Sequence, residues 1–411
     1  METILVSALG KKAFLARYYL ADDPNRVQAE GQIATTALVK LRQRVHGIPF
    51  PDLIIPLCTR EAMDESLPIL KRELSSINID VLETPLGLGS TELQEIVAGL
   101  LNKIPPRCRL TLDLTHGFRS YPFLFFIAIQ YLTVLREDVE IDGVYYGMFE
   151  ARPAQNEPAP FVDLAILLEM MEWIYAVRVF RDTSNATRLA QLLKPLGKAP
   201  GEGQIKSIQR DLRNYSRAYW LACPIELGMA ANKLNEQLNR GIPATLSERV
   251  PLAGELFGEI QQLANKFMLP FKKGKSKAKL TTKELERQAR IIDNFIENGQ
   301  VNQALGLIRE WLISAVMLHN GADREWLKKK VREGEEIKQL LWKMNELGIE
   351  AGQVWFEVIQ TRNDIYHHGF GVDTVNISEE QETEIRTRWA TVKSKLGNQD
   401  YWRLSSTEAR T

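Results

Sequence analysis

Short apolar runs alternate with longer segments of helical apolar spacing along the first 150 residues. The runs predict buried strands, and the spaced segments predict amphipathic helices. The expected strands are residues 3–9, 52–57, 77–82, 109–114 and 139–149, and the expected helices are residues 33–45, 60–74, 91–101 and 118–136. Turn residues around Asp22 and Pro24 predict a hairpin at residues 13–32. This alternation predicts a Rossmann-like α/β domain with a mostly parallel sheet and helices on both faces.

The pattern changes after residue 150, where three prolines within residues 150–160 indicate a linker. Helical spacing follows at residues 161–180, 189–196, 205–221, 260–267, 301–315, 337–344 and 354–365. The second half is therefore expected to be all-α. We expect three domains: an α/β domain at residues 1–158, a helical linker or insert at residues 159–285, and a helical bundle at residues 286–411.

Composition narrows the class of protein. Lysine plus arginine and aspartate plus glutamate both number 52, so any site for a polyanion must be local. Three widely spaced cysteines fit reduced thiols, and we expect no structural metal. The longest apolar run, residues 121–135, is shorter than the roughly 20 residues that a membrane span needs. Residues 1–3 give no basic start of a signal peptide. These features predict a soluble, cytoplasmic protein.

The loops after three expected strands offer groups that suit an anion. Ligands of such sheets bind beyond the carboxyl ends of the strands, and helix N-termini there attract negative charge. The candidate residues are Ser7, Gly10 and Lys11 in loop one, Thr59 in loop two, and Thr115, His116, Gly117 and Arg119 in loop four. The alternative is that Gly and Thr only form the turns and cap the helices. No loop has the glycine pattern of a P-loop or a dinucleotide fingerprint, so ATP and NAD are not expected.

A second group of candidate residues lies near the C-terminus. Arg362, Asn363, His367 and His368 stand in one short stretch of a chain with five histidines. A guanidinium can hold a phosphodiester, an imidazole can transfer a proton near neutral pH, and an amide can orient either group. The alternative is a solvated arginine and a histidine pair that complements a helix end.

Two motifs carry a family resemblance. Asp113-Leu114-Thr115-His116-Gly117 resembles the Asp-x-Thr-His-Gly motif that names a subfamily of CRISPR-associated CARF proteins. Arg362-Asn363, followed by His367 and Gly369, resembles the Arg-x(4–6)-His signature of HEPN ribonucleases. The chain is thus identified as similar to CARF–HEPN ribonucleases of type III CRISPR systems.

The resemblance implies a metal-independent endoribonuclease that cuts single-stranded RNA in antiviral defence and leaves a 2′,3′-cyclic phosphate. It implies cyclic oligoadenylate as the allosteric activator, with tetra-adenylate favoured over hexa-adenylate, and no cofactor. The candidate residues of loops one, two and four would bind this ligand. Arg362, Asn363 and His367 would be catalytic, and a homodimer, or a higher oligomer, would pair two such sets.

Several alternatives stay open. His116 has a structural alternative, in which it bonds within its own turn, and Asp113 suits a turn-fixing acceptor better than a catalyst. His368 is either a partner that orients the catalytic group or an exposed bystander. The chain could instead be a ligand-binding regulator with an inactive HEPN domain, or a sensor that also cleaves its cyclic ligand.

Overall fold

The computed structural model describes residues 1–154, 156–250, 252–270, 274–275, 278–366 and 379–403. The chain divides into two compact units, Met1–Glu169 and Met170–Thr411, which are called here the sheet unit and the helical unit. The boundary falls within helix α6 (Ala165–Thr183). No helix in these described ranges is long and apolar enough to cross a membrane.

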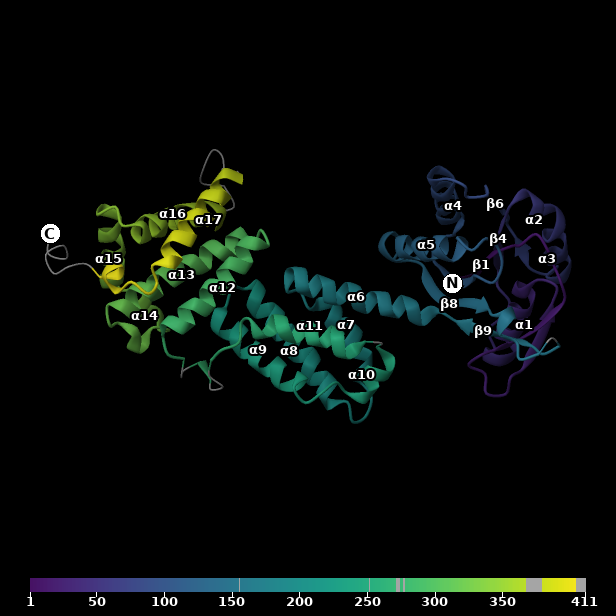
Figure 1. Cartoon of the computed structure of the whole chain (residues 1–411), viewed down its shortest axis with the longest axis horizontal. Coiled ribbons are helices and arrows are strands. Elements are labelled where there is room, and N and C mark those ends of the chain that lie inside the picture. The colour runs from purple at the N-terminus through teal and green to yellow at the C-terminus, as the bar shows by residue number, and fades with distance from the viewer. Residues whose placement is uncertain (155, 251, 271–273, 276–277, 367–378, 404–411) are drawn as a thin grey trace. The chain divides into compact units, whose positions relative to one another are not determined.

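The sheet unit contains a nine-stranded sheet within the described residues (Figure 1). Its strands are β1 (Glu2–Ala8), β2 (Ala16–Leu20), β3 (Gln28–Gly31), β4 (Leu53–Cys58), β5 (Asn78–Ile79), β6 (Leu82–Glu83), β7 (Cys108–Asp113), β8 (Glu140–Gly147) and β9 (Ala159–Asp163). Their order is β3-β2-β9-β8-β7-β1-β4-β5, and β6 also pairs with β4. The β2–β3 and β8–β9 pairs are antiparallel, and the other pairs are parallel.

Helices cover both faces of this sheet, as the sequence predicts. One face packs against α1 (Ala34–His46), α2 (Arg60–Glu65) and α3 (Leu67–Glu73), and the other against α4 (Ser90–Lys103) and α5 (Tyr121–Leu135) (Figure 1). Each face of the sheet has its own apolar core. Strand β1 lies between β7 and β4 inside the sheet, and its successive side chains point alternately into the two cores. Burial on both faces is the reason for the continuous apolar run Ile4, Leu5 and Val6.

The structure corrects three of the predicted elements. The single helix expected at residues 60–74 is split into α2 and α3 at Ser66, because Pro68 in the first turn of α3 cannot donate within a continuous helix. The strand expected at residues 77–82 is two short strands, β5 and β6. The helix expected from residue 161 begins at Ala165, since residues 159–163 form β9 between β8 and β2. The boundary expected after residue 158 therefore lies ahead of a strand of the sheet.

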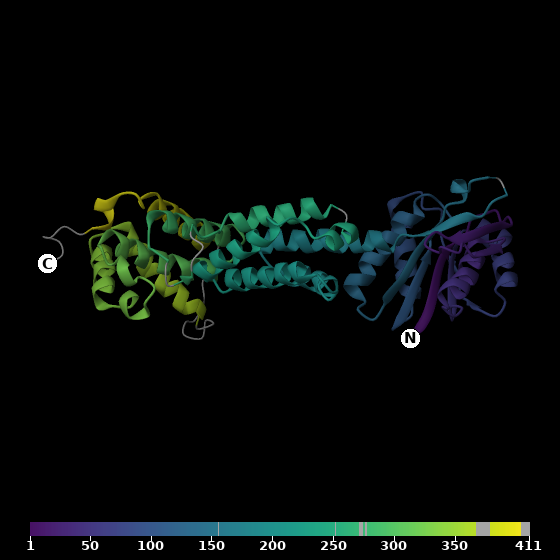
Figure 2. The same ribbon diagram turned by 90° about the horizontal axis from the view of Figure 1, so that it is seen from below.

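The described part of the helical unit contains helices and no strand. The helices after α6 are α7 (Thr187–Leu196), α8 (Gly203–Trp220), α9 (Pro224–Leu238), α10 (Ala244–Arg249), α11 (Ala253–Asn265), α12 (Thr282–Glu297), α13 (Val301–His319), α14 (Lys329–Arg332), α15 (Glu335–Glu346), α16 (Glu350–Tyr366), α17 (Glu379–Ser394) and α18 (Gln399–Trp402), with a short 3₁₀ turn at Asp323–Glu325. Helices α7, α8, α9 and α11 run alongside one another (Figure 2).

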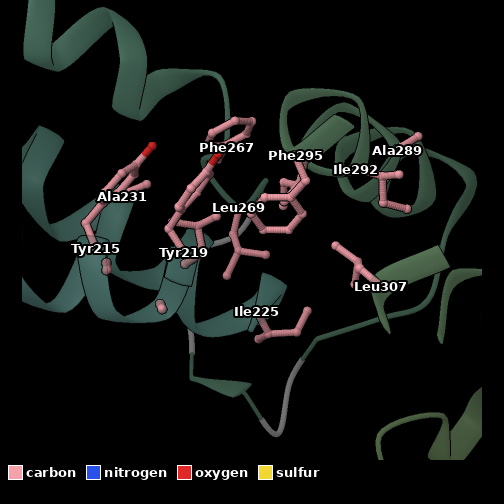
Figure 3. Close-up of a cluster of buried hydrophobic side chains, with 14 of the residues drawn as sticks. Tyr215, Tyr219, Ile225, Ala231, Phe267, Leu269, Ala289, Ile292, Phe295 and Leu307 are labelled. Carbon is pink, nitrogen blue, oxygen red and sulfur yellow. The ribbon is translucent and has the colours of Figure 1, made fainter. Parts of the chain in front are cut away.

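One continuous apolar core runs through this unit, from Trp173 to Trp402. The ring of Tyr219 on α8 packs 4.8 Å from that of Phe295 on α12, between centroids (Figure 3). The Tyr219 hydroxyl lies 2.6 Å from Asn294 Oδ1 and 2.8 Å from Gln300 Oε1. The division expected after residue 285 therefore does not correspond to two separate cores.

Candidate functional site

Loops one and four meet at the carboxyl end of the parallel strands. The register of β1 and β7 places Ser7 opposite Asp113, at the point where both strands end. A methyl group added at Gly10 would lie 3.9 Å from the Gly117 nitrogen and 3.9 Å from His116 Cβ. The sequence-predicted candidates of the two loops are thus neighbours, at the edge where ligands of such sheets bind.

Asp113 fixes the shape of loop four. Its Oδ1 accepts hydrogen bonds from the Thr115 N–H (3.0 Å) and the Thr115 hydroxyl (2.5 Å), and its Oδ2 accepts one from the Thr35 hydroxyl (2.7 Å). The Thr115 oxygen in turn accepts from the Gly147 N–H at 2.9 Å. Asp113 is therefore the turn-fixing acceptor that its position at a strand end predicts.

His116 joins loop four to the start of helix α1. Its Nε2 accepts a hydrogen bond from the Ala34 N–H at 3.2 Å, which satisfies one of the unpaired N–H groups in the first turn of α1. The bond goes to another element, and so it differs from the bond within its own turn that was the structural alternative for His116. A nitrogen that accepts carries no proton, so the neutral ring is protonated at Nδ1.

This contact makes His116 sensitive to pH. Burial lowers the pKa of His116 below its ordinary 6.5, against a smaller opposing effect of Asp113. The folded state holds the ring neutral, so its contribution to stability is present above about pH 6.5 and is lost as the pH falls below that value. We expect His116→Gln, which does not titrate, to show a smaller loss of thermal stability between pH 7.5 and pH 5.5 than the unaltered chain.

Thermal unfolding of the full chain at the two pH values measures this difference. Burial also lowers the pKa of His319, but that residue is present in both proteins, and its effect cancels in the comparison. Equal losses in the two proteins would show that the bond to Ala34 does not depend on the protonation of His116.

Gly117 is required by the backbone of loop four. Its φ is +95°, a conformation that L residues rarely adopt. An added Cβ would lie 2.7 Å from Tyr121 Cδ2 and 2.8 Å from Ala8 Cβ. Loop four can pack this closely on the end of β1 only because no side chain stands at this position.

The other candidates differ in their access to solvent. Lys11 is exposed, and its Nζ lies 3.3 Å from Glu61 Oε2. Arg119 is exposed, and the part of the chain that is described shows no ion pair to it. Thr59 precedes α2, and its carbonyl accepts from the Met63 N–H at 3.0 Å. Ser7 is fully buried, and its hydroxyl has no partner among the described residues. Lys11 and Arg119 thus place exposed cations on loops one and four, which suits an anionic ligand.

Two residues that hold these loops are not evident from the sequence. Thr35 in α1 bonds Asp113, and the Ser66 hydroxyl donates to the Gly10 carbonyl at 2.6 Å. Both contacts span more than 50 residues of sequence. The local sign of Ser66 is its place two residues before Pro68, which interrupts a continuous helix.

Helix α16 carries part of the second candidate group. It confirms the helix predicted from Val354 and Val358, both of which are buried. Arg362 is half-buried and Asn363 is exposed, both in the last turns of the helix. His367, His368 and Gly369 lie outside the described residues.

A small cavity of about 150 Å³ lies beside the preceding turns of α16, where Val354, Val358 and Thr361 line it. Arg388 of α17 lines it and pairs with Glu357 at 2.8 Å and Glu384 at 2.9 Å. Burial raises the pKa of Glu357, and Arg388 opposes this effect. The pair with Glu357 thus links α17 to the helix that presents Arg362, whereas the pair with Glu384 lies within α17.

His319 ends helix α13. Its Nε2 lies 3.0 Å from the Leu396 carbonyl, and its ring stacks on Trp402 with centroids 6.0 Å apart. These contacts give His319 a role in packing. In the described residues, no three His, Cys, Asp or Glu side chains are grouped as a metal site.

Comparisons with known proteins relate part of this chain to CRISPR-associated proteins. Residues 169–270 match the family model described as CRISPR-associated protein MJ1674, second domain. CRISPR-associated protein MJ1674 of Methanocaldococcus jannaschii is 28% identical over 134 residues, which are 32% of this chain and 20% of that protein. The match thus spans about a fifth of the length of this curated relative.

A solved structure, Enterococcus italicus Csm6 bound to cyclic hexa-2′-fluoro-hexa-dAMP, aligns with a TM-score of 0.40 and 11% identity. The alignment covers 100% of this chain and 97% of that chain. The family model thus covers the helices directly after the sheet.

Proposed function

We propose that this chain is an endoribonuclease of type III CRISPR defence that cuts single-stranded RNA when cyclic oligoadenylate binds. The sheet unit would be the CARF sensor, and the C-terminal part of the helical unit would be the HEPN nuclease domain. The observation that carries the proposal is the meeting of loops one and four, with Lys11 and Arg119 exposed, at the ligand-binding edge of a mostly parallel sheet. The partial match to a CRISPR-associated protein supports it.

The nuclease reaction needs no metal in this proposal. The 2′-OH of the RNA attacks the adjacent phosphorus, the bond to the 5′-oxygen of the next nucleotide breaks, and the products are a 2′,3′-cyclic phosphate and a 5′-OH. His367 transfers a proton, Arg362 stabilises the negative charge that develops on the phosphate, and Asn363 orients one of these groups. One chain supplies only these three residues, which is few for an active site. Two chains would therefore form a composite active site from both sets.

An exposed apolar face on α5 supports a homodimer. Phe123 (76% exposed), Ile127 (46%), Tyr131 (50%) and Val134 (77%) recur at helical spacing. An apolar stripe of this kind marks an interaction surface. A second copy of the sheet unit would cover it and bring two carboxyl edges to one cyclic ligand. Light scattering of the full chain decides between one and two copies.

Activation by the cyclic ligand is the direct test. We expect cyclic tetra-adenylate to raise the rate of cleavage of a fluorescent single-stranded RNA at least about tenfold in EDTA, because differential binding of about 1.4 kcal/mol to the active state corresponds to this factor. Cyclic hexa-adenylate is expected to act more weakly, and linear tetra-adenylate is the control.

The outcomes separate the alternatives. Tight binding of the cyclic ligand without RNA cleavage would indicate a regulator with an inactive nuclease domain. Loss of the cyclic ligand during incubation would indicate that the sensor cleaves it. The second result is disfavoured, because Nε2 of His116 is already engaged by the Ala34 N–H.

A further inference from the structure

A polar groove lies between helices α7 and α8 of the helical unit. It has a volume of about 300 Å³. Thr187, Gln191 and Lys194 line it from α7, and Gln209, Arg213 and Arg217 line it from α8. Neither the ligand edge of the sheet nor the Arg362 stretch includes any of these residues.

The groove is positively charged. Lys194, Arg213 and Arg217 are exposed, and no carboxylate is among its lining residues. In the described residues none of these three cations forms an ion pair. The chain as a whole has a formal net charge of zero, so this is a local concentration of positive charge.

The floor of the groove is held by bonds to the main chain. The Gln209 amide donates to the Ala190 carbonyl at 2.6 Å, and the Ser216 hydroxyl accepts from the Ala186 N–H at 3.2 Å. These bonds join α8 to the start and middle of α7. They fix the spacing of the two helices, and so the cations are presented from a preformed surface.

Helix α8 has two contrasting faces. Tyr215 and Tyr219 point into the core (Figure 3). Arg213, Arg217 and Trp220 follow at spacings of four and three residues, which places them on one exposed stripe. Trp220 is 42% exposed, an uncommon position for so large an apolar ring. The stripe therefore combines two guanidinium groups of the groove with an aromatic surface about one turn further along α8.

We propose that the α7–α8 groove binds single-stranded RNA, with Lys194, Arg213 and Arg217 on phosphates and Trp220 stacked on a base. This rests on the proposed function, since it assigns the track along which the RNA substrate is held. Cations that follow the backbone and an aromatic ring that stacks on any base are the features of sequence-tolerant single-strand binding. An acidic protein partner would use the cations but would gain little from Trp220.

The test measures binding apart from cleavage. The His367→Ala chain keeps the RNA intact, and anisotropy of a fluorescent, unstructured RNA in EDTA gives its Kd at several salt concentrations. We expect Lys194→Gln/Arg213→Gln/Arg217→Gln to weaken binding at least about tenfold and to reduce the slope of log K against log salt by about 2, near 0.7 for each lost phosphate contact.

A matched control removes the same charges elsewhere in residues 169–270. Lys233, Arg240 and Arg249 are exposed, and Lys233→Gln/Arg240→Gln/Arg249→Gln is expected to change Kd by less than about twofold. Trp220→Ala should weaken binding about fivefold or more with an unchanged salt slope, and Trp220→Phe should restore most of it.

Equal effects of the two triple variants on the Kd for RNA would contradict RNA binding in the groove. They would show that any positive charge on the surface attracts the polyanion. Equal binding of duplex DNA with the same dependence on Trp220 would overturn single-strand recognition. If the unaltered chain binds RNA through the groove but never cuts it, the proposal of a nuclease is wrong and the proposal of RNA binding in the groove is retained. If the chain cuts RNA and the groove variants bind RNA normally, the proposal of RNA binding in the groove is wrong and the proposal of a nuclease is retained.

Discussion

Replacing His367 by alanine is expected to lower the rate of RNA cleavage about 10²–10⁴-fold, the usual contribution of a positioned acid–base group. The imidazole is the one side chain of the proposed set that can exchange a proton near neutral pH. Binding of the cyclic ligand should be unchanged, because loops one and four of the sheet unit do not include this residue. Single-turnover cleavage rates and ligand titration by calorimetry measure the two effects.

His368→Ala is the matched control, since it removes the same ring one position later. We expect a loss of less than about tenfold if His368 is a bystander, and a larger one if it orients His367. A variant His367→Ala that cleaves RNA like the unaltered chain would remove this residue from the mechanism. Loss of activity in His368→Ala alone would move the catalytic role to that residue.

Replacing Gly117 by alanine is expected to destabilise the sheet unit and to abolish its response to the cyclic ligand. The backbone conformation alone costs about 1–2 kcal/mol for an L residue. The added Cβ meets Tyr121 and Ala8 at distances below 3 Å, and overpacking of this kind costs about 1–3 kcal/mol more. Loop four must then move away from β1, and the neighbouring Gly10 and His116 lose their arrangement. Thermal unfolding and ligand titration measure the result.

Gly47→Ala separates backbone strain from crowding. Gly47 also has a positive φ, +65°, but nothing lies within 4 Å of an added Cβ. The Gly47→Ala variant should therefore lose only the stability that the backbone conformation costs, and it should keep full affinity for the cyclic ligand. Equal stability and equal ligand affinity in the two variants would show that the close approach of loop four to β1 is not needed for binding.

The sequence predicted the elements whose pattern is strong within one segment. β1 was predicted because its apolar residues form a continuous run. α13 was predicted because its apolar residues recur at helical spacing over several turns. Helix α9 was missed, because Gly228, Ala230 and Ala231 give it little apolar contrast. Gly228 is small for a tertiary reason: an added Cβ would lie 2.5 Å from Leu269 Cγ.

In the candidate site too, only the contacts between residues close in sequence could be predicted. The position of Asp113 at a strand end indicated a turn-fixing acceptor, and the structure places Thr115 on it. The sequence could not indicate that His116 would bond Ala34 or that Thr35 would complete the Asp113 network, since those partners lie about 80 residues away. Burial of Ser7 was equally hidden, because it follows from packing on both faces of the sheet.

Strand β9 has a consequence for how the chain is made. β2 (Tyr18) pairs with β9 (Ala159), so this part of the sheet joins residues from the two ends of the unit. A ribosome adds about 5–20 residues each second, so β2 and β3 leave the exit tunnel many seconds before their partner. Contacts this distant in sequence form slowly. During that interval the hairpin has an unpaired edge that can pair with other nascent chains. The risk of such aggregation depends on how quickly synthesis reaches residue 163.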